Sequence, residues 1–289
     1  MENRENHINI GPKDYSNEVM TAQEYSEVAH DHPYIYHLKS GDKELIYFGT
    51  KHSSDPSSEI FDKIKADLEQ YRPDLVMVEG FPAINNQPNE QLQKIVEMFP
   101  DDNNLIKSHG ESLFTTKKAI EFGYKVDSPE PAEQDKAKFL LEQGLSKEAI
   151  FAQEIVTVLH QYTRLLDKPD LEKYINLFVD QSKKGFNWPD FDFSFENFKE
   201  IYKHYKDKEF DINDVEGLKD LADPIPWDGK EYSDLNKASS LDSYYRDKYM
   251  VEEIAKKFKE VDKIYVVFGA SHAVMQEPAL RKMFEEYEE

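Results

Sequence analysis

Three short apolar runs along the chain stop at residues that can carry out chemistry. Each run and the residues that follow it read Leu45-Ile-Tyr-Phe-Gly-Thr-Lys-His52, Leu75-Val-Met-Val-Glu79 and Ile264-Tyr-Val-Val-Phe-Gly-Ala-Ser-His272. Continuous runs of β-branched and aromatic residues are typical of strands that are buried on both faces in an α/β protein. Ligands of such sheets bind beyond the carboxyl ends of the strands. We therefore expect His52, Glu79 and His272 to meet at one edge of a central sheet.

The apolar pattern between these runs predicts helices. Four apolar residues between 57 and 71 recur at helical spacing, so the strands before and after them should be parallel members of a βαβ unit. A β-prone run at 33–38 is joined to the run at 44–48 by a connector that contains glycine, which predicts a hairpin. The expected fold class is α/β, with a central mixed, partly parallel sheet, helices on both faces and a helical cap.

Further helices are expected to fill most of the chain. Thr21 and Glu24 have the spacing of a capping box, which predicts a short helix there. The other predicted helices cover residues 87–98, 109–122, 132–182, 236–260 and 277–287. We interpret residues 1–289 as a single α/β domain, into which residues 132–235 are inserted as the helical cap.

One part of this insertion, residues 185–230, has an unusual composition. Aromatic and acidic residues alternate densely in it, as in Gly185-Phe-Asn-Trp-Pro-Asp-Phe-Asp-Phe-Ser-Phe195. Such a segment outside the regular strand–helix order is typical of a lid over a site. It is equally typical of an irregular helical subdomain with an aromatic core of its own. The sequence leaves both interpretations open.

The composition excludes several classes of protein. A net charge of −22 at pH 7 disfavours nucleic acid, whose phosphates it would repel, and anionic lipid. The absence of cysteine excludes disulfides, thiolate ligands and a cysteine nucleophile. No stretch is apolar for long enough to span a bilayer, and the first residues lack the apolar segment of a signal peptide. We therefore expect a cytoplasmic protein that binds neither nucleic acid nor membranes.

The residues at the ends of the runs fit two kinds of chemistry. Two neutral imidazoles and a carboxylate can form an open metal site with a position for water, so His52, Glu79 and His272 are candidate metal ligands. Alternatively, a histidine acts as a general base toward water and Glu79 orients it, without a metal. Ordinary loop histidines and a strand-end glutamate are the simpler interpretation of each residue taken alone.

Three further charged residues are candidates for catalysis. Glu111 begins a predicted helix, where acids are generally favoured, and Glu130 follows a predicted strand between two prolines. Either carboxylate could transfer protons at the common edge. Arg246 lies in a predicted helix and could bind a substrate carboxylate or a developing oxyanion, although most such arginines are solvated surface charges.

The ordered set of motifs resembles the superfamily that joins TraB pheromone-shutdown proteins, Tiki proteases, ChaN-like haem-binding proteins and erythromycin esterases. The resemblance spans residues 45–275 and is carried by Gly49-Thr-Lys-His52-Ser-Ser, Pro73-Asp-Leu-Val-Met-Val-Glu79, Gly110-Glu111, Ser128-Pro-Glu130-Pro131, Arg246-Asp-Lys-Tyr-Met250 and Gly269-Ala-Ser-His272. It is nearest to the TraB/Tiki branch, for which it implies peptide hydrolysis dependent on a divalent metal. Manganese or cobalt would be the ion, and zinc or iron are the alternatives. The chain departs from Tiki proteins in lacking a secretion signal or anchor, and its segment 185–230 has no clear counterpart.

Together these observations predict a metal-dependent hydrolase that acts on a peptide or another amide or ester. One alternative is an esterase without a metal, in which a histidine is the general base. The other is a protein that sequesters a peptide or haem without turnover, since histidines at strand ends can also ligate haem. The sequence does not indicate an oligomeric state.

Overall fold

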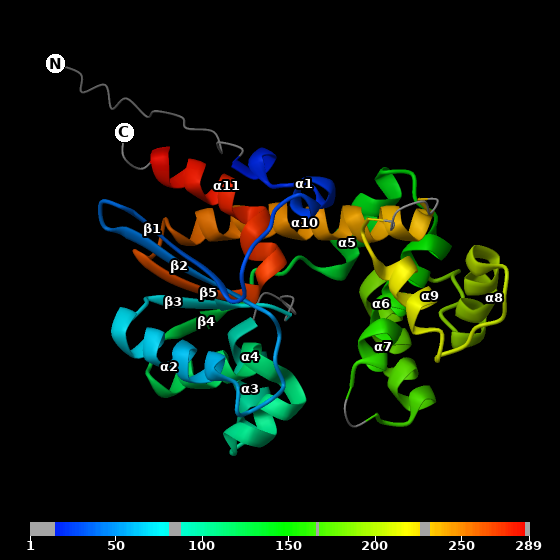
Figure 1. The fold of residues 1–289 in the computed structure, drawn as a ribbon, viewed down its shortest axis with the longest axis horizontal. Coiled ribbons are helices and arrows are strands. Elements are labelled where there is room, and N and C mark those ends of the chain that lie inside the picture. The colour runs from blue at the N-terminus through cyan, green and yellow to red at the C-terminus, as the bar shows by residue number, and fades with distance from the viewer. Residues whose placement is uncertain (1–14, 81–87, 166–167, 226–231, 287–289) are drawn as a thin grey trace.

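A computed structural model describes residues 15–80, 88–165, 168–225 and 232–286, and it has an α/β fold (Figure 1). Its strands are β1 (Tyr34–Ser40), β2 (Lys43–Thr50), β3 (Leu75–Val78), β4 (Lys125–Asp127) and β5 (Lys263–Gly269). They form one sheet in the order β1-β2-β5-β3-β4. The hairpin β1–β2 is antiparallel, and every other neighbouring pair is parallel. The predicted mixed, partly parallel sheet is therefore confirmed.

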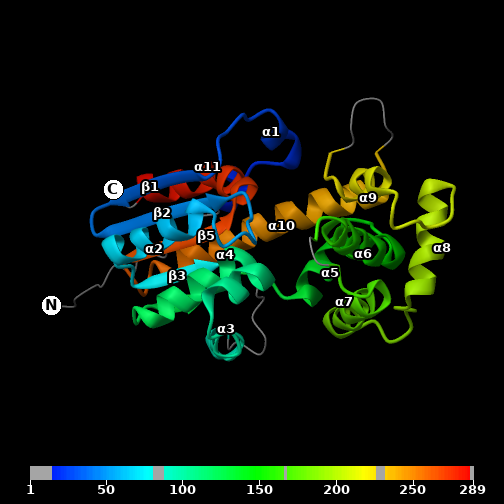
Figure 2. The same cartoon turned by 60° about the horizontal axis from the view of Figure 1, so that its bottom comes forward.

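Helices cover both faces of this sheet (Figures 1 and 2). The helical elements are η1 (Tyr15–Glu18), α1 (Ala22–Ser26), α2 (Glu59–Tyr71), α3 (Pro88–Glu97), α4 (Asp102–Glu121), α5 (Glu133–Glu142), α6 (Lys147–Thr163), α7 (Leu171–Phe186), α8 (Phe195–Lys206), α9 (Val215–Ala222), α10 (Asp234–Lys257) and α11 (Ala270–Glu286). One core joins the sheet to α10 and α11, and a second joins its other face to α2, α3 and α4. Thr21 and Glu24 form the predicted capping box at α1.

Two helix boundaries differ from the prediction in ways that affect the site. Helix α4 begins at Asp102, not near residue 109, and its axis is broken at Gly110, whose φ of 63° and ψ of −150° are not helical. Helix α11 begins at Ala270, directly after β5, and continues through Pro278. The prediction of a helix that starts near residue 277 was therefore wrong, and His272 lies in the first turn of α11, not in a loop.

The helices between β4 and α10 form a separate lobe beside the sheet, and α10 runs from this lobe back to the sheet (Figure 2). Their core is distinct from the two sheet cores. The aromatic residues of segment 185–225 belong to it: Phe186, Phe193, Phe198 and Tyr202 are buried, and Phe198 and Tyr202 both contact Phe210. This supports the interpretation as a subdomain with its own aromatic core; residues 226–230 of the segment lie outside the described residues.

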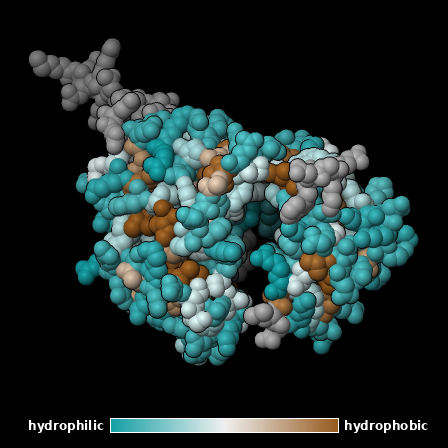
Figure 3. All heavy atoms as spheres, in the orientation of Figure 1, coloured by the Kyte–Doolittle hydropathy of each residue, from teal (hydrophilic) through white to brown (hydrophobic). Residues whose placement is uncertain are grey.

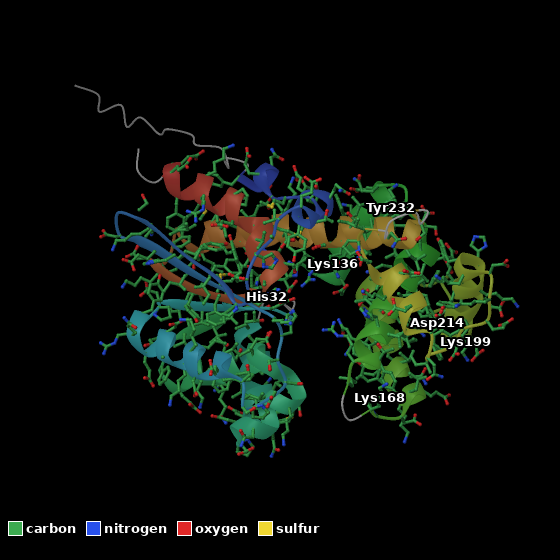
Figure 4. The ribbon with its side chains drawn as sticks, viewed as in Figure 1. His32, Lys136, Lys168, Lys199, Asp214 and Tyr232 are labelled. Atoms are coloured by element: carbon green, nitrogen blue, oxygen red, sulfur yellow. The ribbon has the colours of Figure 1, made fainter. Side chains whose placement is uncertain are left out.

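Charged side chains join the lobe to α10. Lys136 of α5 is buried, and its Nζ lies 3.1 Å from carboxylate oxygens of both Glu133 and Asp242. Figure 4 places Lys136 where the lobe meets α10, and Lys168 and Lys199 farther out on the lobe. Within the described part of the chain, no helix has the length and apolar character needed to cross a bilayer.

Candidate functional site

The carboxyl ends of three parallel strands are level with one another. The register pairs Thr50 with Gly269 across β2 and β5, and it pairs Val78 with Val267 across β3 and β5. The three predicted ligands, which follow these strands, therefore emerge at the same edge. Figure 4 places His32, the second residue before β1, at this edge. In the space-filling view of Figure 3, a hydrophilic hollow separates the sheet from the helical lobe.

The structure brings His52, Glu79 and His272 together. The carboxylate of Glu79 lies between the two imidazoles: His52 Nε2 is 3.9 Å from Oε2, and His272 Nε2 is 3.6 Å from Oε1. The backbone N–H of Gly269 donates a hydrogen bond to Glu79 Oε2 at 2.7 Å. Two residues near opposite ends of the chain therefore face one glutamate, as the strand ends predicted.

Glu111 binds the first histidine. Its Oε1 lies 2.6 Å from His52 Nδ1 and also accepts the hydroxyl of Thr50 at 2.7 Å. Its Oε2 accepts the backbone N–H of Ser53 at 3.1 Å. The broken helix axis at Gly110 places this carboxylate beside the 50–53 segment, so Glu111 is more than a favourable residue at a helix start. The side chain of His52 remains 60% exposed, whereas that of Glu111 is 5% exposed.

Asp247 binds the second histidine, and the sequence analysis missed it. Asp247 is fully buried, and its Oδ1 lies 2.7 Å from His272 Nδ1. Gln276 also donates to Oδ1, at 2.6 Å. Two signals were present in the sequence, because Asp247 directly follows Arg246 and Gln276 is four residues after His272, on the same helix face.

Arg246 and Glu130 form an ion pair next to Glu79. Arg246 donates from Nε to Glu130 Oε2 at 3.1 Å and from Nη2 to Glu130 Oε1 at 2.8 Å. The same Nη2 is 3.5 Å from Glu79 Oε1. Glu130 Oε1 also accepts the backbone N–H of Gly80 at 3.1 Å. Arg246 and Glu130 therefore both lie at the site, where they form an ion pair with each other.

The charged groups of the site oppose the effect of burial on their pKa values. Burial alone would raise the pKa of Glu79, but the neighbouring positive groups, first His272 and then His52, lower it. Burial alone would lower the pKa of His272, but Asp247 and Glu79 raise it to about 10. The hydrogen bond with Glu111 raises the pKa of His52. The site therefore favours ionised carboxylates beside protonated imidazoles.

The glycines of the two Gly-x-x-His motifs allow close contacts between the motifs. A Cβ on Gly269 would lie 2.8 Å from His52 Nε2, so the second glycine makes room for the first histidine. A Cβ on Gly49 would lie 2.7 Å from the Cβ of Ala273 and 2.9 Å from the Cα of Ala270, both in α11. Neither glycine has a positive φ, so space and not backbone conformation requires it. The glycine of each motif therefore allows residues of the other motif to pack against it.

The donor atoms of the predicted metal site form two pairs, both of which include Glu79. A shared ion would lie about 2 Å from each ligand atom. The two imidazoles instead approach different oxygens of Glu79, one of which already accepts the Gly269 N–H. Across the described ranges, no group of three or more His, Cys, Asp or Glu side chains is arranged to hold a metal ion. The residues have suitable chemistry, and a metal at this site stays a prediction.

Comparison of the chain with protein-family models, with curated proteins and with solved structures gives no match. The function must therefore be argued from the geometry of the site.

Proposed function

We propose that the protein is a hydrolase of an ester or amide, such as a peptide, in which His52 is the general base that activates water. The observation that carries this proposal is the pairing of His52 with Glu111. A buried carboxylate holds Nδ1 of a largely exposed imidazole, which leaves Nε2 facing the site. This is the arrangement by which a carboxylate orients a catalytic histidine and stabilises its protonated form.

The reaction can be followed from the positions of these groups. The distance from His52 Nε2 to Glu79 Oε2, 3.9 Å, is shorter than two hydrogen bonds of about 2.8 Å, so one water molecule can contact both atoms. As that water attacks the substrate carbonyl, its proton passes to Nε2 of His52, and Glu111 stabilises the imidazolium. The same proton then passes to the leaving group, which regenerates the neutral base. Glu111, not Glu130, is assigned this supporting role because Glu130 is paired with Arg246.

Metal-dependent hydrolysis, which the family resemblance implies, is a separate proposal. No step is assigned to a metal here, because no group of three such side chains in the described part of the chain is arranged to hold one. The two versions differ in a simple measurement. A base-catalysed enzyme retains its turnover in EDTA, whereas a metal-dependent one loses it and regains it with manganese or cobalt.

The test is an assay of the purified protein with p-nitrophenyl acetate, p-nitrophenyl butyrate and a library of fluorogenic peptides. We expect turnover of at least one probe in the presence of EDTA. Because Glu111 raises the pKa of His52, the base is deprotonated only at a higher pH than an ordinary histidine. The rate should therefore increase with pH beyond about 6.5. Absence of turnover with every probe, together with a Soret band after addition of haemin, would support the sequestering alternative.

Alanine at Gly269 should impair this reaction with little loss of stability. The new methyl group would lie 2.8 Å from His52 Nε2 and 3.4 Å from Glu79 Oε2. The His52 side chain is exposed and can move away, so the free energy of unfolding should change by less than about 1 kcal/mol. Displacement of the base by about 1 Å should lower kcat about 100-fold. Urea denaturation and steady-state kinetics measure the two effects.

Gly49→Ala is the matched control, because its obstacles belong to the backbone and the core. The added Cβ would lie 2.8 Å from the carbonyl oxygen of Tyr34 as well as close to α11. Overpacking of this kind should destabilise the protein by about 1–3 kcal/mol. Full activity in Gly269→Ala would contradict the assigned position of the base.

A further inference from the structure

A connected set of buried polar side chains lies behind His272. It joins three elements. Tyr47 belongs to β2, and Asp247 and Gln276 belong to α10 and α11, which pack on one face of the sheet (Figure 1). The Tyr47 hydroxyl donates to Gln276 Oε1 at 3.1 Å, and Gln276 Nε2 donates to Asp247 Oδ1 at 2.6 Å. Asp247 Oδ1 in turn holds His272 Nδ1 at 2.7 Å.

We propose that Asp247 is a positioning residue of the site, which fixes the ring of His272 against Glu79, and that Gln276 and Tyr47 hold Asp247 in place. This inference rests on the hydrolase function proposed above. It gives the site two carboxylate–imidazole pairs with different tasks. Glu111 orients an exposed ring toward substrate, whereas Asp247 orients a buried ring toward the central glutamate.

The geometry of Asp247 indicates that it orients the His272 ring more than it stabilises the protein. A fully buried carboxylate is costly, and apolar residues of similar volume often stabilise a protein as well or better. Oδ1 accepts from two partners, whereas Oδ2 is buried and has no hydrogen-bond partner among the described residues. An arrangement that served stability alone would satisfy both oxygens. Both donors are instead directed at the one oxygen that contacts His272.

The partners of Asp247 leave it little freedom. Tyr47, Asp247 and Gln276 are each fully buried. Gln276 spans the gap between a strand and a helix, because its amide accepts from Tyr47 and donates to Asp247. Its Nε2 also lies 3.0 Å from the sulfur of Met250. Rotation of the carboxylate would break a bond to Gln276 as well as the bond to His272, so the position of one ring depends on three elements.

Asp247→Asn tests the inference most directly. Asparagine keeps the volume of the side chain, but it removes the charge and can present an NH₂ group to His272. We expect kcat on the p-nitrophenyl ester to decrease about 10- to 100-fold, because a displaced His272 ring no longer fixes Glu79 beside the attacking water, while KM changes less than about threefold. The signals of the His272 ring nitrogens, identified by their loss in His272→Gln, should shift in ¹H–¹⁵N NMR spectra.

Milder variants and controls separate positioning from general stability. Gln276→Met and Tyr47→Phe should reduce kcat in a graded way, and they decide the question if Asp247→Asn does not fold. Asp127→Asn is the control for the carboxylate, since Asp127 is buried and paired with Lys257 at 2.7 Å. Tyr202→Phe is the control for the hydroxyl, since Tyr202 is fully buried and donates to Asp214 at 2.9 Å. Neither control should change kcat or the His272 signals.

The outcomes distinguish this inference from the proposed function. Turnover that is unchanged in Asp247→Asn would overturn the inference and leave the hydrolase function intact. If the wild-type protein turns over no probe, the proposed function fails, and the NMR spectra still test the orientation of the ring. His272 signals that are the same in Asp247→Asn and in the wild type would then overturn the positioning role.

Discussion

Replacement of His52 by alanine should abolish hydrolysis while the protein remains folded. A general base contributes roughly 10²- to 10⁴-fold to the rate, so kcat/KM should decrease by that factor. The His52 side chain is 60% exposed and contributes to none of the three cores, and the buried carboxylate of Glu111 keeps its hydrogen bonds from Thr50 and Ser53, so the melting temperature should change much less than in His272→Ala. Steady-state kinetics on the best ester probe and thermal unfolding monitored by circular dichroism measure both quantities.

His37→Ala is a matched control for this variant. The His37 side chain is 52% exposed, and its Nε2 lies 3.8 Å from a carboxylate oxygen of Glu44, so it resembles His52 in exposure and in pairing. It lies within β1, outside the site, and its loss should leave kcat/KM unchanged. Full turnover in His52→Ala would refute the base assignment, and loss of its cooperative melt would show that the residue is structural.

His272→Ala, in contrast to His52→Ala, should destabilise the protein strongly. Removal of the imidazole would leave the buried carboxylate of Asp247 without its charged partner, which costs about 3–5 kcal/mol in comparable cases. Urea denaturation measures the change. In the double variant His272→Ala/Asp247→Asn the stranded charge is absent, so part of the stability should return. A double variant no more stable than His272→Ala would contradict this explanation.

The loss caused by His272→Ala should also depend on pH. Because the pKa of His272 is raised to about 10 in the folded protein, from about 6.5 for an unfolded chain, folding favours the protonated ring. The stability that results is fully present below about pH 6.5 and is lost as the pH rises toward 10. The difference in free energy of unfolding between the wild type and His272→Ala should therefore be largest near pH 6 and decrease up to pH 10. A constant difference would show that folding does not raise the pKa of His272.

The sequence was sufficient to predict the sheet and the meeting point of the site. Parallel strands have their carboxyl ends at one edge of a sheet. The apolar runs that lead to His52, Glu79 and His272 were therefore enough to predict that these residues meet. The partners of these residues were harder to predict. Asp247 approaches His272 because α10 and α11 pack on the same face of the sheet, and the two signals in the sequence do not by themselves indicate that packing.

One local prediction failed, and one pair of alternatives stayed open, for reasons that concern tertiary structure. The helix predicted from residue 277 instead begins at Ala270, directly after β5, and it continues through Pro278. The acidic and aromatic segment contains residues that suit either a binding wall or a core. Its burial follows from contacts with α6, since both Phe191 and Phe193 pack against Phe151, and periodicity in the sequence does not reveal such contacts.

The central position of β5 determines when the site can form during synthesis. Residues 263–269 lie between β2 and β3, so the strands described before them form two separated pairs, β1–β2 and β3–β4. A ribosome must synthesise the chain through residue 269 before these halves can join. Strand pairing over such long separations is intrinsically slow. The two glycines that accommodate each other's motifs meet only at that last step, so a nascent or truncated chain without β5 carries His52 and Glu79 but has no assembled site. Folding itself therefore prevents the protein from acting before β5 has been synthesised.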